Sequence, residues 1–225
     1  MKDTVYLIIH GFAGGLHETE YLTEFLRSEG LDVRAVLLSG HGGTKKDLRK
    51  TAYTDWIYSV ENTVEELANE FRHIVLLGFS MGGLICLHFA GMPEVQKLVL
   101  VNAPIYFWNM KIILRDVLNS LKHRRFEKMR FYQKAAMRSS LKTNIDFLNV
   151  LSKSKKLLRN VKKPSLILQC VDDESVRPKS ARYIHAGIGE SAECKVYEGG
   201  CHLIFLEDSG VRDDICRDIM RFINA

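Results

Sequence analysis

A serine flanked by glycines is the first feature of this sequence that suggests chemistry. The apolar run HIVLL at 73–77 leads into GFSMGG at 78–83, and a second apolar run, LICLHFA, follows at 84–90. The spacing G-x-S-x-G between a strand and a helix forms a tight turn that exposes the serine hydroxyl at the start of the helix. We therefore predict that Ser80 is a nucleophile. The alternative is a glycine-rich turn whose serine only caps the helix.

A serine hydroxyl needs a base to take its proton, and the base needs an acidic group to orient it. The chain has eight histidines, so composition cannot select the base. Two adjacent carboxylates, Asp172 and Asp173, end an apolar run at 165–171, and His202 follows the turn EGGC at 198–201. These residues lie far from Ser80 in the sequence, so the fold must bring them together.

Six short apolar runs alternate with segments of helical spacing. Nearly continuous apolar runs are typical of strands that are covered on both faces of a parallel sheet. Helical spacing at 19–29 and 54–71 separates the first three runs, which favours a doubly wound α/β domain. The predicted strands are Val5–Ile9, Val33–Leu38, Ile74–Leu77, Leu98–Val101, Leu166–Val171 and Cys194–Tyr197.

The composition is that of a folded globular protein. The 225 residues are 46% hydrophobic and 26% charged, which is ordinary for such proteins. No run approaches the roughly 18 apolar residues of a membrane-spanning helix, and we see no secretory signal, so we expect a cytoplasmic protein. Five cysteines without CxxC spacing favour free thiols over disulfides or a metal site.

One segment has a charge unlike the rest of the chain. Residues 105–163 hold 16 Lys and Arg against three carboxylates, a net charge of +13, so the remainder, at +5 − 13, carries −8. This segment also interrupts the alternation of strands and helices after Val101. We expect two to four short helices there, forming an insertion with a surface role of its own.

Four motifs together resemble the α/β-hydrolase superfamily. They are HGF at 10–12, GHG at 40–42, GFSMGG at 78–83 and NAP at 102–104, each after a predicted strand. Within the superfamily, the sequence is most similar to small bacterial carboxylesterases that resemble monoacylglycerol lipases. The resemblance spans nearly the whole chain and is weakest at 105–160. Larger members have two further strands before the first one predicted here.

The resemblance implies an α/β-hydrolase fold of about six mostly parallel strands with helices on both faces. It also implies a small helical cap, or lid, inserted after the fourth strand. We therefore predict a core of residues 1–104 and 161–225 and a cap of residues 105–160.

The order of the chain selects the base. In this fold the nucleophile is followed by the acid and then by the histidine, each after a successive strand. His185 falls inside a predicted helix before the last strand, whereas His202 follows that strand through a flexible glycine turn. His202 is the predicted base.

The same order places the acid after the strand 166–171. The family pattern has an apolar residue three positions after the acid, and Val176 stands in that position relative to Asp173. Asp172 would have Ser175 there, so we assign it a supporting role in the loop and keep Glu174 as a third choice. Asp173 is the predicted acid.

Two backbone N–H groups are expected to bind the oxyanion of the tetrahedral intermediate. One belongs to Met81, the residue after the nucleophile. The family resemblance gives the other to Phe12 in the loop HGFAGG at 10–15. His10 and His41 are expected to pack and form hydrogen bonds within their loops.

The start of the insertion is rich in aromatic residues. Phe107 and Trp108 are candidates for substrate binding, and a role in docking the cap is an equal alternative. The basic cap is expected to be mainly a solvated surface, with weak association with an anionic membrane as the alternative. No motif suggests nucleic acid binding, and the sequence leaves the oligomeric state open.

The resemblance implies a serine carboxylic-ester hydrolase that forms an acyl-enzyme. The expected substrate is a short- to medium-chain ester or a monoacylglycerol, and no metal or organic cofactor is expected. Thioesterases, peptidases and C–C bond hydrolases use the same parts, so these chemistries remain alternatives. A non-enzymatic member that only binds a ligand is a further alternative.

Overall fold

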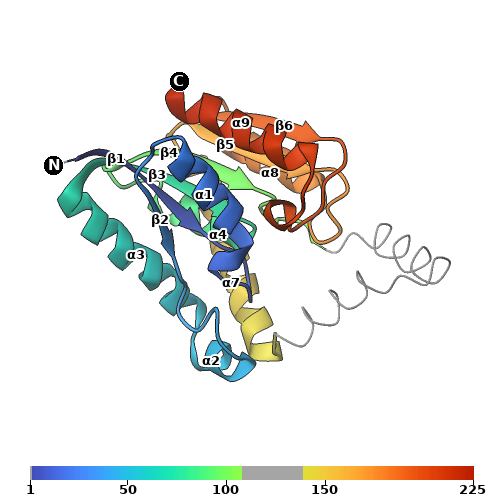
Figure 1. Ribbon diagram of the computed structural model, residues 1–225. Coiled ribbons are helices and arrows are strands. Elements are labelled where there is room, and N and C mark those ends of the chain that lie inside the picture. The colour runs from blue at the N-terminus through green and yellow to red at the C-terminus, as the bar shows by residue number, and fades with distance from the viewer. Residues whose placement is uncertain (1, 108–138) are drawn as a thin grey trace.

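A single six-stranded sheet forms the centre of the protein. The computed structural model describes residues 2–107 and 139–225 (Figure 1). The strand order is β2-β1-β3-β4-β5-β6 and every pairing is parallel, which confirms the predicted sheet and makes it all parallel. The strands are β1 (Lys2–Ile9), β2 (Val33–Val36), β3 (Phe71–Phe79), β4 (Val95–Val101), β5 (Ser165–Cys170) and β6 (Ala192–Tyr197).

Helices cover both faces of this sheet. The first face packs against α1 and α9, and the second packs against α3, α4, α7 and α8. None of the helices within 2–107 and 139–225 combines the length and hydrophobicity needed to cross a membrane. The α-helices are α1 (Glu20–Ser28), α2 (Lys45–Lys50), α3 (Tyr53–Glu70), α4 (Met81–Phe89), α7 (Leu141–Leu157), α8 (Lys179–Ile188) and α9 (Gly210–Asn224). Three short 3-10 helices are η1 (Leu16–Thr19), η2 (Leu158–Asn160) and η3 (Ile204–Leu206).

Strand β1 shows why its sequence is apolar without interruption. Alternate side chains of a strand point to opposite faces of the sheet. Leu7 and Ile9 join the cluster beneath α3 and α4, whereas Tyr6 and Ile8 join the cluster beneath α1 and α9. Both faces are covered, so both sets of side chains are buried.

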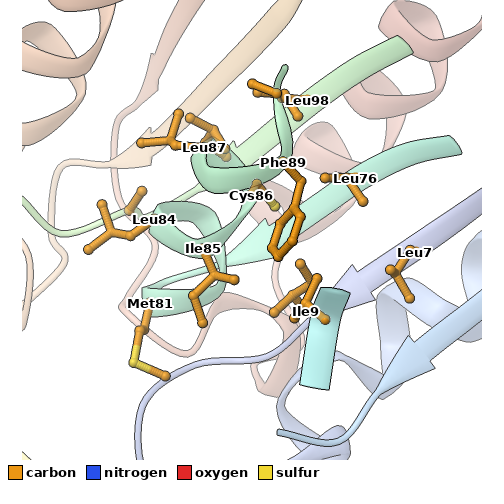
Figure 2. Packing of buried hydrophobic residues seen from close by; sticks show 14 of the residues in the cluster. Leu7, Ile9, Leu76, Met81, Leu84, Ile85, Cys86, Leu87, Phe89 and Leu98 are labelled. Atoms are coloured by element: carbon orange, nitrogen blue, oxygen red, sulfur yellow. The ribbon is translucent and has the colours of Figure 1, made fainter. Parts of the chain in front are cut away.

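Helix α4 is buried on nearly all sides, as its apolar sequence predicts. Leu84, Ile85 and Cys86 are fully buried. Figure 2 shows them in one cluster with Leu7 of β1 and Leu76 of β3, beneath the helix. Each fully buried large apolar side chain contributes about 1.5–3 kcal/mol to folding. This packing fixes the start of α4, where Ser80 lies.

Helix α7 lies within the predicted cap range but packs against the core. The Oγ of Ser154 donates a hydrogen bond to the carbonyl oxygen of Leu84 over 3.1 Å, and the Nε2 of His88 lies 3.0 Å from the same Oγ. His88 is thus a satisfied packing residue. The other residues of the cap range that were predicted to form helices, 108–138, lie outside the described residues, so the cap boundaries stay a prediction.

Candidate active site

Ser80 occupies a strained turn between β3 and α4. Its backbone has φ 52° and ψ −121°, a conformation that L-residues rarely adopt and that is concentrated at functional sites. A Cβ at Gly78 would lie 2.3 Å from the nitrogen of Gly83, and a Cβ at Gly82 would lie 2.1 Å from the oxygen of Ile9. The glycines are therefore required by close approach of the backbone, and the predicted tight turn is present.

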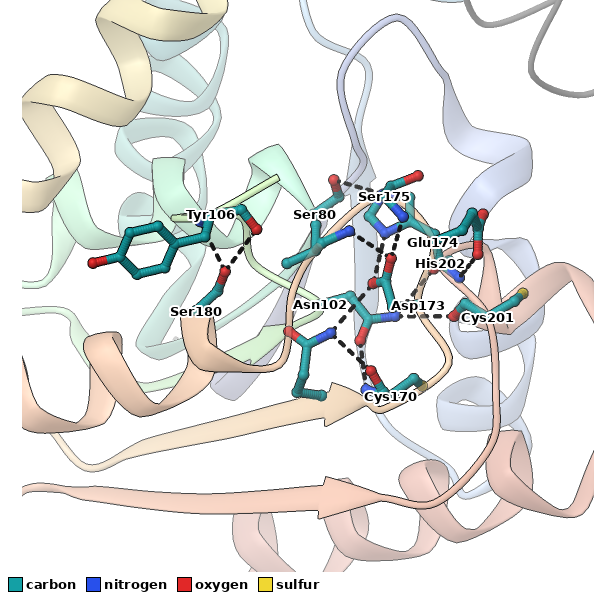
Figure 3. A network of polar contacts seen from close by, with 12 residues as sticks. Ser80, Asn102, Tyr106, Cys170, Asp173, Glu174, Ser175, Ser180, Cys201 and His202 are labelled. Atoms are coloured by element: carbon teal, nitrogen blue, oxygen red, sulfur yellow. Dashed lines mark hydrogen bonds and ion pairs between the residues drawn. The ribbon is translucent and has the colours of Figure 1, made fainter. Parts of the chain in front are cut away.

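Three predicted residues meet at the carboxyl edge of the sheet (Figure 3). The Nε2 of His202 lies 3.0 Å from the Oγ of Ser80, and the Nδ1 of His202 lies 2.9 Å from the Oδ2 of Asp173. Ser80 follows β3, Asp173 follows β5 and His202 follows β6. With a proton on Nδ1, the imidazole can donate to the carboxylate and accept the hydroxyl proton of the serine.

Asp173 is held in place by its own loop. The side chain is fully buried, and its Oδ1 accepts hydrogen bonds from the N–H groups of Ser175 and Val176 over 2.8 and 2.7 Å. The amide Nε2 of Gln169 donates to Oδ2 over 3.3 Å. These bonds aim Oδ2 at His202.

The neighbours of Asp173 occupy different positions. Asp172 is half-buried, and the carboxylate that contacts the imidazole belongs to Asp173. The buried carboxylate of Glu174 instead accepts the backbone N–H of His202 over 3.2 Å. Of the three acidic residues, the structure thus brings Asp173 to the ring, while Glu174 holds the backbone of the histidine loop.

Asn102 is a site residue that the sequence analysis did not single out. It is fully buried, and its backbone φ is 49°. Its Nδ2 donates to the carbonyl oxygens of Cys201 and His202 over 3.2 and 3.1 Å, and its Oδ1 accepts from the N–H of Cys170 over 2.9 Å. Asn102 therefore ties the histidine loop to the ends of β4 and β5. The NAP motif at 102–104 was the signal that could have identified it.

His10 holds the loop that follows β1. Its Nε2 accepts the N–H of Leu38 over 3.2 Å, which leaves the proton on Nδ1, 2.8 Å from the carbonyl oxygen of Gly11. Burial, reinforced by His41, lowers the pKa of His10 to about 3, so the ring is neutral. The predicted packing role of His10 is confirmed, and the bond to Gly11 fixes the peptide that carries the N–H of Phe12.

Met81 is the first residue of α4 and directly follows Ser80. Phe12 lies in the loop that His10 holds. A Cβ at Gly11, the residue before Phe12, would lie 3.3 Å from the Cβ of Ser80, so the loop of Phe12 comes close to the serine. The role of the Phe12 and Met81 N–H groups as oxyanion donors stays a prediction.

Carboxylates surround His202 and change its titration. Burial by itself lowers the pKa of this imidazole, but the charge and hydrogen bond of Asp173, followed by Glu174 and Glu18, outweigh burial and raise the pKa to about 9. The protonated ring is therefore stabilised. This environment suits a base whose protonated form must persist through a transition state.

Aromatic side chains gather beside the loop of Phe12. The ring of Phe147, on α7, lies 5.1 Å from the ring of Phe12 and 5.9 Å from that of Phe107. The ring of Trp56 lies 5.9 Å from that of Phe12. Phe107 also pairs its backbone with Val176, in the loop of Asp173. Phe107 thus joins an apolar wall near the site, whereas Trp108 lies outside the described residues.

The part of the chain that the structure describes has no group of three or more His, Cys, Asp or Glu side chains able to hold a metal ion.

Comparison with solved structures shows the same fold. One similar structure is described as LipS and LipT, two metagenome-derived lipolytic enzymes; it has a TM-score of 0.78 at 20% identity and covers 99% of this chain and 94% of that one. The monoacylglycerol lipase of Paleococcus ferrophilus has a TM-score of 0.74 at 18% identity, covering 99% of this chain and 96% of its own.

Sequence comparison gives relatives and a family. A carboxylesterase of Bacillus subtilis (strain 168) is 25% identical over 229 residues, covering 98% of this chain and 92% of that protein. A thermostable monoacylglycerol lipase of Bacillus sp. (strain H-257) is 27% identical over 196 residues, covering 82% and 76%. Residues 2–209 match the Hydrolase_4 family, described as serine aminopeptidase, S33. The chain belongs to this family of α/β hydrolases and is distantly related to bacterial carboxylesterases and monoacylglycerol lipases.

Proposed function

We propose that this protein is a serine carboxylic-ester hydrolase that acts on a short- to medium-chain ester or a monoacylglycerol. The observation that carries the proposal is the continuous set of contacts from Ser80 through His202 to Asp173, at 3.0 and 2.9 Å. Such an arrangement activates a hydroxyl that is otherwise a weak nucleophile.

In the proposed reaction, the Oγ of Ser80 attacks the ester carbonyl while the Nε2 of His202 takes the hydroxyl proton. Asp173 stabilises the resulting imidazolium and does not take up the proton. The imidazolium then donates its proton to the leaving alcohol, which leaves an acyl-enzyme. Water, activated by the same imidazole, releases the acid and restores Ser80.

The tetrahedral intermediates carry an oxyanion that the N–H groups of Phe12 and Met81 are proposed to bind. Each such donor is worth about 3 kcal/mol in enzymes where one has been removed. The position of Met81 at the N-terminus of α4 adds the favourable end of the helix dipole.

The acyl group is proposed to lie against the aromatic wall of Phe12, Phe107 and Phe147. These rings are only partly buried and pack beside the loop that approaches Ser80. An apolar surface with few polar groups suits an alkyl chain. The names of the two bacterial relatives, a carboxylesterase and a monoacylglycerol lipase, support the same substrate class.

The proposal is tested by the turnover of p-nitrophenyl esters with acyl chains from two to sixteen carbons, each as wild type and Ser80→Ala. We expect turnover that favours short to medium chains and that falls to the background rate in the variant. If the wild type turns over no ester in the series, or if Ser80→Ala keeps the wild-type rate, the proposal is wrong.

A peptidase is the second candidate, because the family is described as serine aminopeptidase, S33. Aminoacyl p-nitroanilides test it in the same assay. Faster turnover of the anilides than of the best ester, again lost in Ser80→Ala, would replace the ester hydrolase by a peptidase that uses the same three residues.

A further inference from the structure

A buried glutamate lies under the loop that carries Phe12. Glu18, on η1, is only 8% exposed, and its Oε2 accepts the backbone N–H of Gly11 over 3.0 Å. Its own N–H donates to the carbonyl oxygen of Gly15 over 3.0 Å. The loop of residues 10–15 therefore folds around this side chain.

Two glycines leave room for the carboxylate. A Cβ at Gly14 would lie 2.0 Å from the Oε2 of Glu18, and the three atoms nearest to that position all belong to the carboxylate of Glu18. A Cβ at Gly11 would lie 3.1 Å from the same Oε2 and 3.3 Å from the Cβ of Ser80. The carboxylate and the serine thus pack close to one glycine.

The hydrogen bond that Gly11 donates to Glu18 fixes the peptide next to the one that carries the N–H of Phe12, the proposed oxyanion donor. Glu18 holds the N–H of the peptide between His10 and Gly11, and His10 holds the carbonyl of the peptide between Gly11 and Phe12. Two consecutive peptide planes are fixed in this way. A hydrogen bond to an ionised acceptor is about twice as strong as one between neutral groups, so Glu18 is a firm anchor.

The charge of Glu18 also reaches the imidazole. Asp173, Glu174 and Glu18 are the carboxylates whose charges favour the protonated form of His202. Asp173 and Glu174 come from the loop after β5, whereas Glu18 comes from the opposite side of the site, after β1.

We propose that Glu18 is a positioning residue: its carboxylate fixes the loop that aims the N–H of Phe12 at the oxyanion. This inference rests on the proposed serine hydrolase function and adds a residue that acts through others, without contact with the substrate.

Two substitutions separate the hydrogen bond that Glu18 accepts from the charge that it carries. Glu18→Gln keeps an acceptor for Gly11 but loses the charge, and Glu18→Ala loses both. Glu20→Gln is the matched control, because Glu20 is exposed on the next turn. Ester turnover as a function of pH and the rate of fluorophosphonate labelling of Ser80 are measured for each, together with the melting temperature.

For Glu18→Ala we expect kcat and the labelling rate to fall about 10- to 100-fold with KM changed less than 3-fold, because an oxyanion donor is misaligned. For Glu18→Gln we expect a smaller loss, with the rising limb of the pH profile shifted to lower pH. Glu20→Gln should match the wild type in both.

A double substitution tests the contact itself. Gly14→Ala should lower kcat by displacing the carboxylate, and in the Glu18→Ala background it should cost little more, because the three atoms nearest to the added Cβ belong to the carboxylate that has been removed. Independent effects that multiply would overturn the inference, as would a Glu18→Ala protein that melts earlier but keeps the wild-type kcat. If Gly14→Ala does not fold, the pH profile of Glu18→Gln still decides, since an unshifted limb contradicts the role of the charge.

Fluorophosphonate labelling distinguishes a failure of the inference about Glu18 from a failure of the proposed function. A wild type that is labelled but turns over no ester refutes the proposed substrate and leaves the labelling ratios to test Glu18. A wild type that turns over esters with Glu18→Ala unaffected refutes the role of Glu18 alone.

Discussion

The two flanks of Ser80 are built by opposite means. The acid–base flank consists of the loops after β5 and β6, where Asp173 and His202 are held by side-chain hydrogen bonds, including those of Asn102. The oxyanion flank consists of the loop 10–15 and the turn 78–83, where a Cβ at Gly78 or Gly82 would meet backbone atoms and a Cβ at Gly14 would meet the carboxylate of Glu18. The comparison teaches that the first flank depends on which functional groups are present, whereas the second also depends on positions that carry no side chain.

The largest difference is expected on the acid–base flank. Asp173→Asn should lower kcat by about 10⁴-fold, because an amide at this position favours the wrong imidazole tautomer. Asp172→Asn, one residue away, is the matched control and should change kcat less than about 3-fold, because the structure gives the contact with the ring to Asp173. Steady-state kinetics on one p-nitrophenyl ester compare them, and a larger loss in Asp172→Asn would transfer the role of acid to Asp172.

A single methyl group added at Gly82 should disrupt the oxyanion flank. Gly82→Ala would place a Cβ 2.1 Å from the oxygen of Ile9, so the turn must move. We expect the free energy of unfolding to fall by about 1–3 kcal/mol or more, with a loss of kcat in the folded protein. Denaturant unfolding and turnover measure the two effects.

Gly91→Ala is the control for that substitution, because nothing lies within 4 Å of the added Cβ. It should be neutral or slightly stabilising, since alanine restricts the unfolded chain. Equal losses in both variants would contradict the claim that close approach at Gly82 is what matters.

A smaller effect should appear in the pH dependence. The base must be neutral to accept a proton, so kcat/KM should rise with pH through the pKa of His202, which is raised to about 9. Glu174→Gln removes one of the charges that raise this pKa, so its rising limb should move to lower pH. A limb near the ordinary value of about 6.5 in the wild type would contradict the electrostatic account.

The smallest effect should concern the acyl group. Phe147→Ala opens the aromatic wall beside Phe12 and Phe107, and we expect the preferred p-nitrophenyl ester to become longer while kcat on the shortest ester changes only a few-fold. Leu148→Ala, on the exposed side of α7, is the control. An unchanged chain-length profile in Phe147→Ala would remove this residue from the proposed acyl site.

Much of the fold could be predicted because its signals are local. The apolar runs predicted all six strands, because the inner strands are mostly buried on both faces and even the edge strands β2 and β6, with Arg34 and Lys195 exposed, keep apolar residues beside these positions. The turn of Ser80 was also predictable, because the glycines that it requires lie within two residues of the serine. Chain order then identified His202 and the loop of the acid, and the family pattern singled out Asp173 through Val176; the structure brings both residues to the site of Ser80.

The contacts of Asn102 and Glu18 could not be predicted in the same way. Asn102 bonds to carbonyl oxygens 99 and 100 residues away, and no spacing rule connects them. Glu18 reads as an ordinary acidic residue at the start of a helix until the loop 10–15 is seen to fold around it. The solvated surface of the basic cap, its alternative of weak membrane association, and the cytoplasmic location stay predictions.

The central claim is that Ser80 is the nucleophile activated by His202. Mass spectrometry of the protein after treatment with a fluorophosphonate tests it most directly. The account predicts one covalent adduct on the peptide that contains Ser80, absent in Ser80→Ala and formed far more slowly in His202→Ala. An unmodified Ser80 in the folded wild-type protein, or an adduct on another residue that persists in Ser80→Ala, would contradict it.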